Sequence, residues 1–295
     1  RVLLPLVFAV AFAGNAAEPP ADLEKRLASS TGAERVDILL ALGEAAAPTS
    51  PKEAIRLAEE ALAESRRLAL AQPSPRALLL RAGGRYHLGD LDGAYAGYEE
   101  ALAASKQGGD ELRVGMSLNG LAIVRMKRGD LAGALPVFGE AMAHLERSGD
   151  REKLASVTSN VSLIHYAKGE YDRARDLMLK ARGLYESAGD EKGQGIVLNA
   201  LGNVYRKLGD TEKARERFER ALVIAERSGH TGLTIGALVN LAEIEAGEKR
   251  WKEALALNRR ALALAREAGS RDSIAVCLNN IGDALRESGD LEGAL

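Results

Sequence analysis

Apolar residues recur along this chain every three or four positions, which is the spacing of one face of an α-helix and not the alternation of a β-strand. One such stretch carries Val197, Leu198, Leu201, Val204 and Tyr205. The same spacing returns in the stretches before and after it. The pattern therefore predicts an all-α chain.

Two turn sequences divide the chain into periods of 40 residues. The first is a glycine, usually followed by an acidic residue, at Gly89, Gly129, Gly169, Gly209 and Gly289, with Glu248-Lys249-Arg250 in its place once. The second lies half a period away, at Gly109, Gly149, Gly189, Gly229 and Gly269. Glycine supplies the left-handed residue that ends a helix, and a following Asp or Ser can cap the next helix. Each period thus predicts two helices of roughly 17 residues, about 25 Å long.

Two series of alanines keep the same 40-residue register. They are Ala54, Ala94, Ala134, Ala174, Ala214, Ala254 and Ala294, and Ala61, Ala101, Ala141, Ala181, Ala221 and Ala261. Small side chains at fixed positions let neighbouring helices approach closely, while larger residues fill the space between pairs. One helix pair cannot bury its own faces, so we expect consecutive pairs to stack.

The repeated unit resembles the tetratricopeptide repeat (TPR). The residues that carry the resemblance are Leu201, Gly202, Tyr205, Gly209, Asp210, Ala214, Phe218 and Ala221. The unit exceeds the usual length of about 34 residues and is similar to the long variant of Pins-type, kinesin light chain and bacterial signalling TPR proteins. The resemblance implies a right-handed α-solenoid of antiparallel helix pairs, whose first helices line a concave face that binds partners. The signature tyrosine is replaced elsewhere by Arg125, His165 and Glu245.

The regular array covers residues 76–295, and its last repeat is truncated just inside the second helix. Residues 18–75 predict irregular N-terminal helices with one degenerate TPR-like pair. In this region Ser50, with Pro51 at the first helical position and Glu53 three residues on, predicts a capping box.

Residues 1–17 resemble a secretory signal peptide. Arg1 precedes the apolar run 2–13, and the small residues after it place cleavage after Ala16 or Ala17. We therefore expect an exported protein, periplasmic or extracellular. No later segment is apolar enough to span a bilayer, so we expect no membrane insertion of the mature part.

Charge and cysteine content narrow the classes of function. The chain has 40 basic and 42 acidic residues and a net charge of −2, with the two signs interspersed. This disfavours a nucleic-acid partner, which requires a basic stripe.

Cys277 is the single cysteine, so no internal disulfide can form. Its repeat equivalents are Val157, Val197 and Ala237, which predict a small buried residue.

The sequence offers no constellation for catalysis. The four histidines are His87, His144, His165 and His230, and none belongs to an i, i+4 metal pair. His165 replaces the signature tyrosine, and His230 replaces a capping aspartate. We therefore expect no catalytic residue, no metal and no cofactor, and a protein that is not an enzyme.

Polar side chains recur on the first helix of each pair and are the candidate peptide-binding residues. They are Asn119, Asn199 and Asn279 at one position, Asn160, Asn240 and Asn280 at the next, Asn203 one turn on, and Tyr166, Arg206 and Arg286 beyond it. An asparagine offers a donor and an acceptor together, so a ladder of them can pair with an extended peptide backbone. The alternative is that some of these asparagines pack between helices and bond to neighbouring backbone.

These features favour a non-catalytic scaffold that binds a peptide or helix of a protein partner in the concave groove. A second hypothesis is the exported sensory region of a membrane signalling enzyme, whose output domain lies beyond residue 295. It rests on the truncated last repeat and on the resemblance of a signal sequence followed by long TPRs to some bacterial sensor kinases and nucleotide cyclases.

Overall fold

A computed structural model describes residues 19–68 and 73–289, and every regular element within them is an α-helix. The helices are α1 (Pro20–Leu27), α2 (Gly32–Ala46), α3 (Pro51–Arg67), α4 (Pro75–His87), α5 (Leu91–Gln107), α6 (Glu111–Lys127), α7 (Leu131–Ser148), α8 (Arg151–Ala167), α9 (Tyr171–Ala188), α10 (Glu191–Lys207), α11 (Thr211–Arg227), α12 (Thr231–Gly247), α13 (Trp251–Glu267) and α14 (Arg271–Ser288). From α5 to α14 each helix has 17 or 18 residues, as the period predicted.

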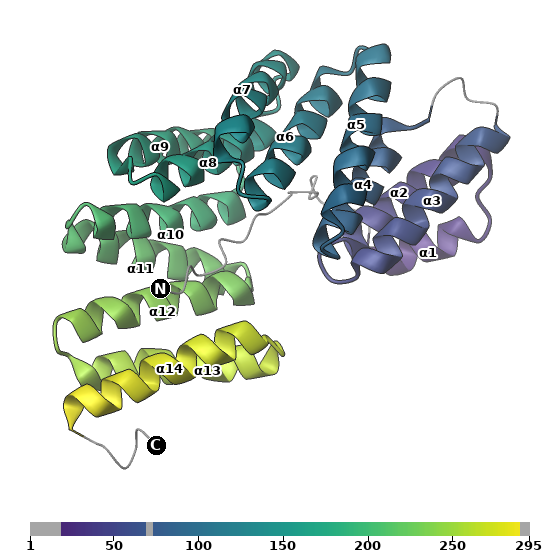
Figure 1. Ribbon diagram of the computed structural model, residues 1–295. Helices are drawn as coiled ribbons and strands as arrows, with labels where there is room; N and C mark the ends of the chain where they lie inside the picture. Colours follow the sequence, from purple (N-terminus) through teal and green to yellow (C-terminus); the bar gives the residue numbers. More distant parts are fainter. Residues whose placement is uncertain (1–18, 69–72, 290–295) are drawn as a thin grey trace. The chain divides into compact units, whose positions relative to one another are not determined.

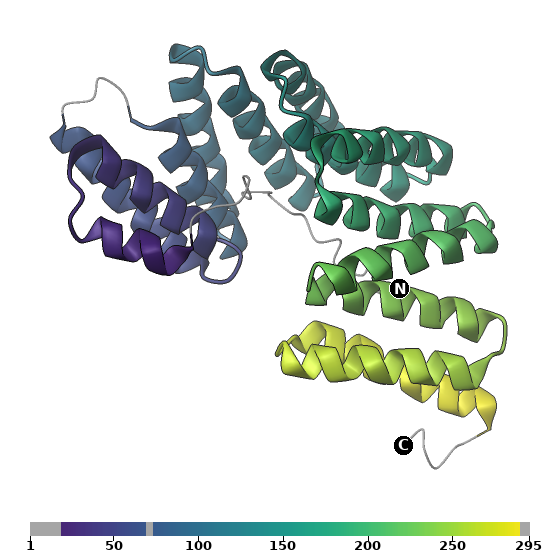
Figure 2. The same ribbon diagram turned by 180° about the vertical axis from the view of Figure 1, so that it is seen from behind.

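Even-numbered helices from α2 to α14 are the first helices of their pairs, and odd-numbered helices from α3 to α13 are the second helices. Within each unit the two helices of a pair pack together, as α4 on α5 and α10 on α11 do, and second helices also pack on the next first helix, as α5 on α6 and α11 on α12 do. Figures 1 and 2 show these neighbours running in opposite directions. The predicted all-α solenoid of antiparallel helix pairs is confirmed.

The chain divides into two compact units, Arg1–Ile164 and His165–Leu295, and the division falls within α8. One apolar core runs through α1 to α6 of the first unit. In the second unit a core joins residues of α12, α13 and α14 and includes Cys277, which is fully buried. Burial raises the pKa of the Cys277 thiol. The prediction of a small buried residue at this position is confirmed.

The turns have the geometry that their sequences predicted. Every glycine of the two turn series has a positive φ, between 65° and 87°. The aspartate that follows accepts a hydrogen bond from the backbone N–H three residues on, at 2.8–3.0 Å, as Asp90 and Asp210 do. His230 replaces the aspartate once and accepts from the N–H of Leu233 through Nδ1 at 3.3 Å. Lys249 replaces the glycine once and has a φ of 61°.

The two alanine series form the contacts between helices. Every member within the described residues, Ala54 to Ala254 in one series and Ala61 to Ala261 in the other, is fully buried. Larger residues such as Phe138 and Phe218 are equally buried, and the Phe218 ring lies against Gly202 of α10, the other helix of its pair. The repeat register therefore determines which residues form the core.

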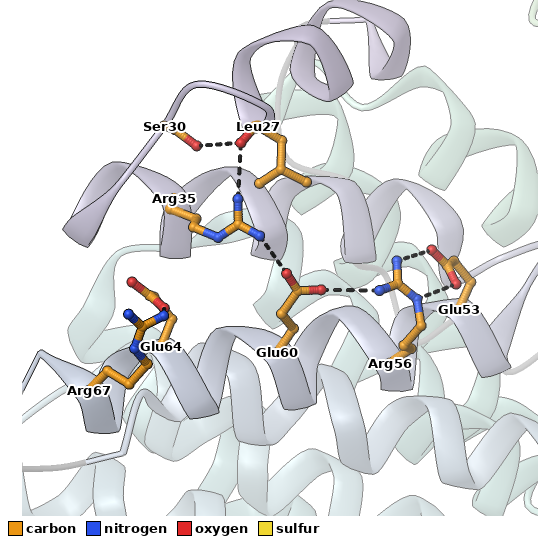
Figure 3. A network of polar contacts seen from close by, with 8 residues as sticks. All are labelled: Leu27, Ser30, Arg35, Glu53, Arg56, Glu60, Glu64 and Arg67. Carbon is orange, nitrogen blue, oxygen red and sulfur yellow. Dashed lines mark hydrogen bonds and ion pairs between the residues drawn. The ribbon is translucent and has the colours of Figure 1, made fainter.

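The capping box predicted at Ser50 is wrong. Ser50 does precede α3, and Pro51 does open it, but the Ser50 side chain makes no capping hydrogen bond. The carboxylate of Glu53 instead accepts from Arg56 at 2.6 and 2.9 Å. Figure 3 shows Arg56 between Glu53 and Glu60, with Arg35 on the far side of Glu60. The guanidinium of Arg56 competes for the carboxylate that a capping box requires.

The predicted signal peptide, residues 1–17, and the last residues of the truncated repeat, 290–295, lie outside the described residues. Among the helices of the described ranges, none combines the length and the apolar character that crossing a membrane requires.

Candidate functional site

First helices of successive pairs contact one another within each unit. In the first unit α2 packs against α4 and α4 against α6, and in the second unit α10 packs against α12 and α12 against α14. Within each unit, the packing partners of the second helices are first helices. The first helices are thus the more closely spaced side of each unit. We call α10, α12 and α14 the first-helix layer of the second unit.

Asparagines link neighbouring first helices at one register. Asn160 donates through Nδ2 to Oδ1 of Asn119 at 3.1 Å, and Asn240 donates in the same way to Asn199 at 3.0 Å. Donor and acceptor are 41 residues apart in both pairs. Asn119, Asn160 and Asn240 are 9%, 5% and 1% exposed, whereas Asn199 is partly exposed. The buried members hold helices together, as the alternative interpretation of the sequence allowed, with a side chain as the partner.

The Asn199–Asn240 pair continues into a more exposed polar row. Asn203 donates to the backbone carbonyl of Asn199 at 3.3 Å and accepts from Arg206 at 3.3 Å. Arg206 also forms an ion pair with Glu243 of α12, and these two side chains are 35% and 32% exposed. Glu243 was not among the residues predicted from the sequence, where its opposite charge 37 residues after Arg206 is the signal that points to it.

Tyr166, near the end of α8, adds an aromatic ring beside this row. Its ring centroid lies 5.5 Å from that of Tyr171, and the two rings meet edge to face. Burial raises the pKa of the Tyr166 hydroxyl, Arg206 opposes this, and Tyr171 and Glu243 add to it. The phenol therefore stays protonated near neutral pH and can both donate and accept a hydrogen bond.

The predicted residues of α14 lie in a different arrangement. Asn279 donates to Asp283 at 3.3 Å, and Arg286 pairs with the same carboxylate at 3.0 Å. Asn280 points to the second helix α13, where its Nδ2 lies 3.5 Å from Oδ1 of Asn258. The structure thus brings Asn279 and Arg286 together through Asp283 and separates Asn280 from them.

Gly236 leaves open space on the first-helix layer. A Cβ atom added at this residue of α12 would meet one neighbouring atom within 4 Å, Nδ2 of Asn199 at 3.9 Å, which is an ordinary contact. Gly202 of α10 differs, because a Cβ there would lie 2.4 Å from the Phe218 ring. A larger side chain at position 236 would therefore project over Asn199 without disturbing the core.

The residues that replace the signature tyrosine all contact the turn or helix that follows. Arg125 donates to the carbonyl of Gly133 at 3.3 Å, and His165 lies 2.7 Å from the carboxylate of Glu170. Glu245 pairs with Arg250 and with Arg215 of α11. These side chains stabilise the turns and the contacts with second helices, and among the described residues of the second unit neither His165 nor Glu245 forms a hydrogen bond or ion pair with the row of Asn199, Asn203 and Arg206.

The histidines have structural partners. His144 lies 2.6 Å from the carboxylate of Glu111, and His87 meets the ring of Tyr86 edge to face. Hydrogen bonds from His144 and Arg147 lower the pKa of Glu111. Within the described ranges no group of three or more His, Cys, Asp or Glu residues has an arrangement that could hold a metal ion.

The family model of the tetratricopeptide repeat matches residues 113–187, 153–227 and 233–295, which together make up more than half of the chain. The chain belongs to the tetratricopeptide repeat family. The matched ranges extend from α6 through α14. A search of curated protein sequences gives no match.

Solved TPR structures share this fold at low sequence identity. A signal transduction ATPase with a tetratricopeptide repeat sensor, PH0952 from Pyrococcus horikoshii, has a TM-score of 0.71 and 18% identity over 92% of this chain and 43% of that one. The apo quorum sensor NprR from B. thuringiensis has a TM-score of 0.70 and 14% identity, covering 93% and 77%. A Rap protein in complex with competence and sporulation factor has a TM-score of 0.66 and 15% identity, covering 92% and 80%.

Proposed function

We propose that this TPR protein is a non-catalytic scaffold that binds an extended segment or helix of a partner protein on its first-helix layer. The observation that carries the proposal is the partly exposed row formed by Asn199, Asn203, Arg206 and Glu243, with Tyr166 beside it. The row lies on the first helices, where the resemblance to the TPR family implies that partners bind. The likeness to a Rap protein solved in complex with competence and sporulation factor supports a binding role.

The chemistry of the row suits a polypeptide backbone. The amides of Asn199 and Asn203 and the hydroxyl of Tyr166 supply both donors and acceptors, which an extended chain requires along its length. Asn240 is buried beneath this surface, and its hydrogen bond to Asn199 holds the Asn199 side chain in place. The open space beside Gly236 leaves room for the ligand where it crosses α12.

A substitution that fills this space tests the proposal. Short peptides are first selected from a random library for binding to the wild-type chain. Gly236→Leu should lower the affinity for these peptides by about tenfold or more. The matched control is Gly183→Leu on the second helix α9, where an added Cβ would meet no atom within 4 Å. Circular dichroism should show both variants fully helical. Equal affinity of the two variants for the selected peptides would refute binding on the first-helix layer.

A second proposal is that the repeats form the exported sensory region of a membrane signalling enzyme. The likeness to the sensor-bearing ATPase, of which the chain covers 43%, supports a sensory role. Expression of the full gene with an alkaline phosphatase fusion would test export. A phosphatase that stays inactive would exclude it, and a reading frame without a kinase or cyclase domain would exclude the output part.

A further inference from the structure

An ion pair joins two neighbouring first helices of the second unit. Arg206, one residue before the end of α10, forms an ion pair with Glu243 of α12. The same two positions one repeat later are Ala246 of α12 and Asp283 of α14, each 40 residues further on. Since α12 packs against α14 as α10 packs against α12, Ala246 lies where a cation for Asp283 would be expected.

Asp283 consequently has only local partners among the described residues. Arg286 of the same helix pairs with it at 3.0 Å and also lies 3.7 Å from the carboxylate of Glu287. One guanidinium is therefore shared between two carboxylates. A Cβ atom added at Gly247, next to Ala246, would meet no atom within 4 Å.

We propose that the bound partner segment supplies a lysine or arginine that pairs with Asp283, in the place that Arg206 takes beside Glu243. The inference rests on the proposed function, because it assumes a segment that crosses the first-helix layer. The chain itself shows which group fits, since a guanidinium occupies the equivalent place one repeat earlier. An acidic partner residue would add a third negative charge beside Asp283 and Glu287.

Two variants remove the proposed contact in opposite ways. Asp283→Asn removes the negative charge, whereas Ala246→Arg keeps the charge and supplies an internal cation that takes the partner's place. The helical stack should tolerate Ala246→Arg, because Arg206 stands at the equivalent position of α10. The control is Asp272→Asn, which makes the same charge change at the exposed first turn of the same helix.

The probe is a library of short acetylated and amidated peptides, in which each position in turn is fixed as lysine, arginine, norleucine or glutamate. The wild-type chain should favour lysine or arginine at one position. Asp283→Asn and Ala246→Arg should each lower the affinity for such peptides by about two- to fivefold, as expected for an exposed ion pair. Neither variant should change the affinity for the norleucine peptides, and Asp272→Asn should change neither.

The outcomes separate this inference from the proposed function. In one outcome the wild-type chain binds peptides that Gly236→Leu does not bind, but it binds them equally well with norleucine or lysine. This result would overturn the basic contact and leave the proposed binding face intact. A preference for glutamate would overturn it as well. If every peptide binds the wild-type chain and Gly236→Leu with equal affinity, both the proposed binding face and the basic contact are refuted.

Discussion

Asn240 of α12 donates its side-chain amide to Asn199 of α10 over 3.0 Å while only 1% of Asn240 is exposed. Asn240→Ala removes this donor and leaves a cavity between two first helices. We expect the free energy of unfolding to fall by about 1–3 kcal/mol, measured by urea denaturation. Asn203→Ala, on the exposed side of α10, should change it by less than about 0.5 kcal/mol. Equal losses in both variants would contradict the structural role of Asn240.

Tyr98 carries a buried hydroxyl that has no hydrogen-bond partner among the described residues. Burial also raises the pKa of this hydroxyl, which keeps it neutral. Phenylalanine stands at the equivalent positions 138 and 218. Tyr98→Phe should therefore raise the free energy of unfolding by about 1 kcal/mol, because an unpaired buried polar group is lost. The reverse change, Phe138→Tyr, should lower it; a destabilised Tyr98→Phe would show that the hydroxyl has a partner.

Lys249 has a φ of 61° at a turn where the other repeats have glycine. A side chain with a Cβ disfavours this left-handed conformation by about 1–2 kcal/mol. We expect Lys249→Gly to raise the thermal midpoint, corresponding to about 1 kcal/mol of added stability. Gly209→Ala, in the equivalent turn after α10, is the reverse control and should lower the midpoint. Unchanged midpoints in both variants would contradict the strain assigned to this turn.

The ion pairs of Glu245 should make the free energy of unfolding depend on pH. Its side chain is 10% exposed, and hydrogen bonds from Arg250 and then Arg215 lower its pKa below the ordinary value of 4.5. A carboxyl group with a lowered pKa stabilises the fold above its ordinary pKa, and this contribution is lost as the pH falls through the lowered value. Glu245→Gln should therefore destabilise the protein at neutral pH by about 1–3 kcal/mol.

The difference in the free energy of unfolding between Glu245→Gln and the wild-type chain should shrink as the pH falls towards about 3. Urea denaturation at a series of pH values measures it. Glu248→Gln is the control, since Glu248 contacts the same two arginines and is 31% exposed. A difference that stays constant with pH would show that the ion pairs of Glu245 do not stabilise the fold.

The helices, their turns and their buried alanines could be predicted from the sequence, because a fixed period makes each repeat a test of the others. Gly209 and Asp210, for example, recur in type and therefore in conformation. The partners of individual polar side chains could not be predicted in this way. Asn240 and Asn199 look alike in the sequence, yet one is buried and the other partly exposed, because burial depends on which neighbouring helix faces each position.

The same limit explains the failed capping box and the missed acidic residue. Ser50 and Glu53 have the right spacing, but Arg56 one turn on competes for the carboxylate. Glu243 was missed because a contact between α10 and α12 joins residues 37 positions apart. Local spacing predicts helices and turns well, whereas contacts between repeats require the packing itself.

Photo-crosslinking to native partners would show which face of the second unit binds them. Benzoylphenylalanine would be introduced at position 203 on the first-helix layer and, in a separate variant, at position 183 on the second helix α9. We expect covalent adducts with a partner protein from position 203 and none from position 183, as judged by mass spectrometry of the purified chain. Adducts from position 183 alone, or equally from both positions, would contradict binding on the first-helix layer.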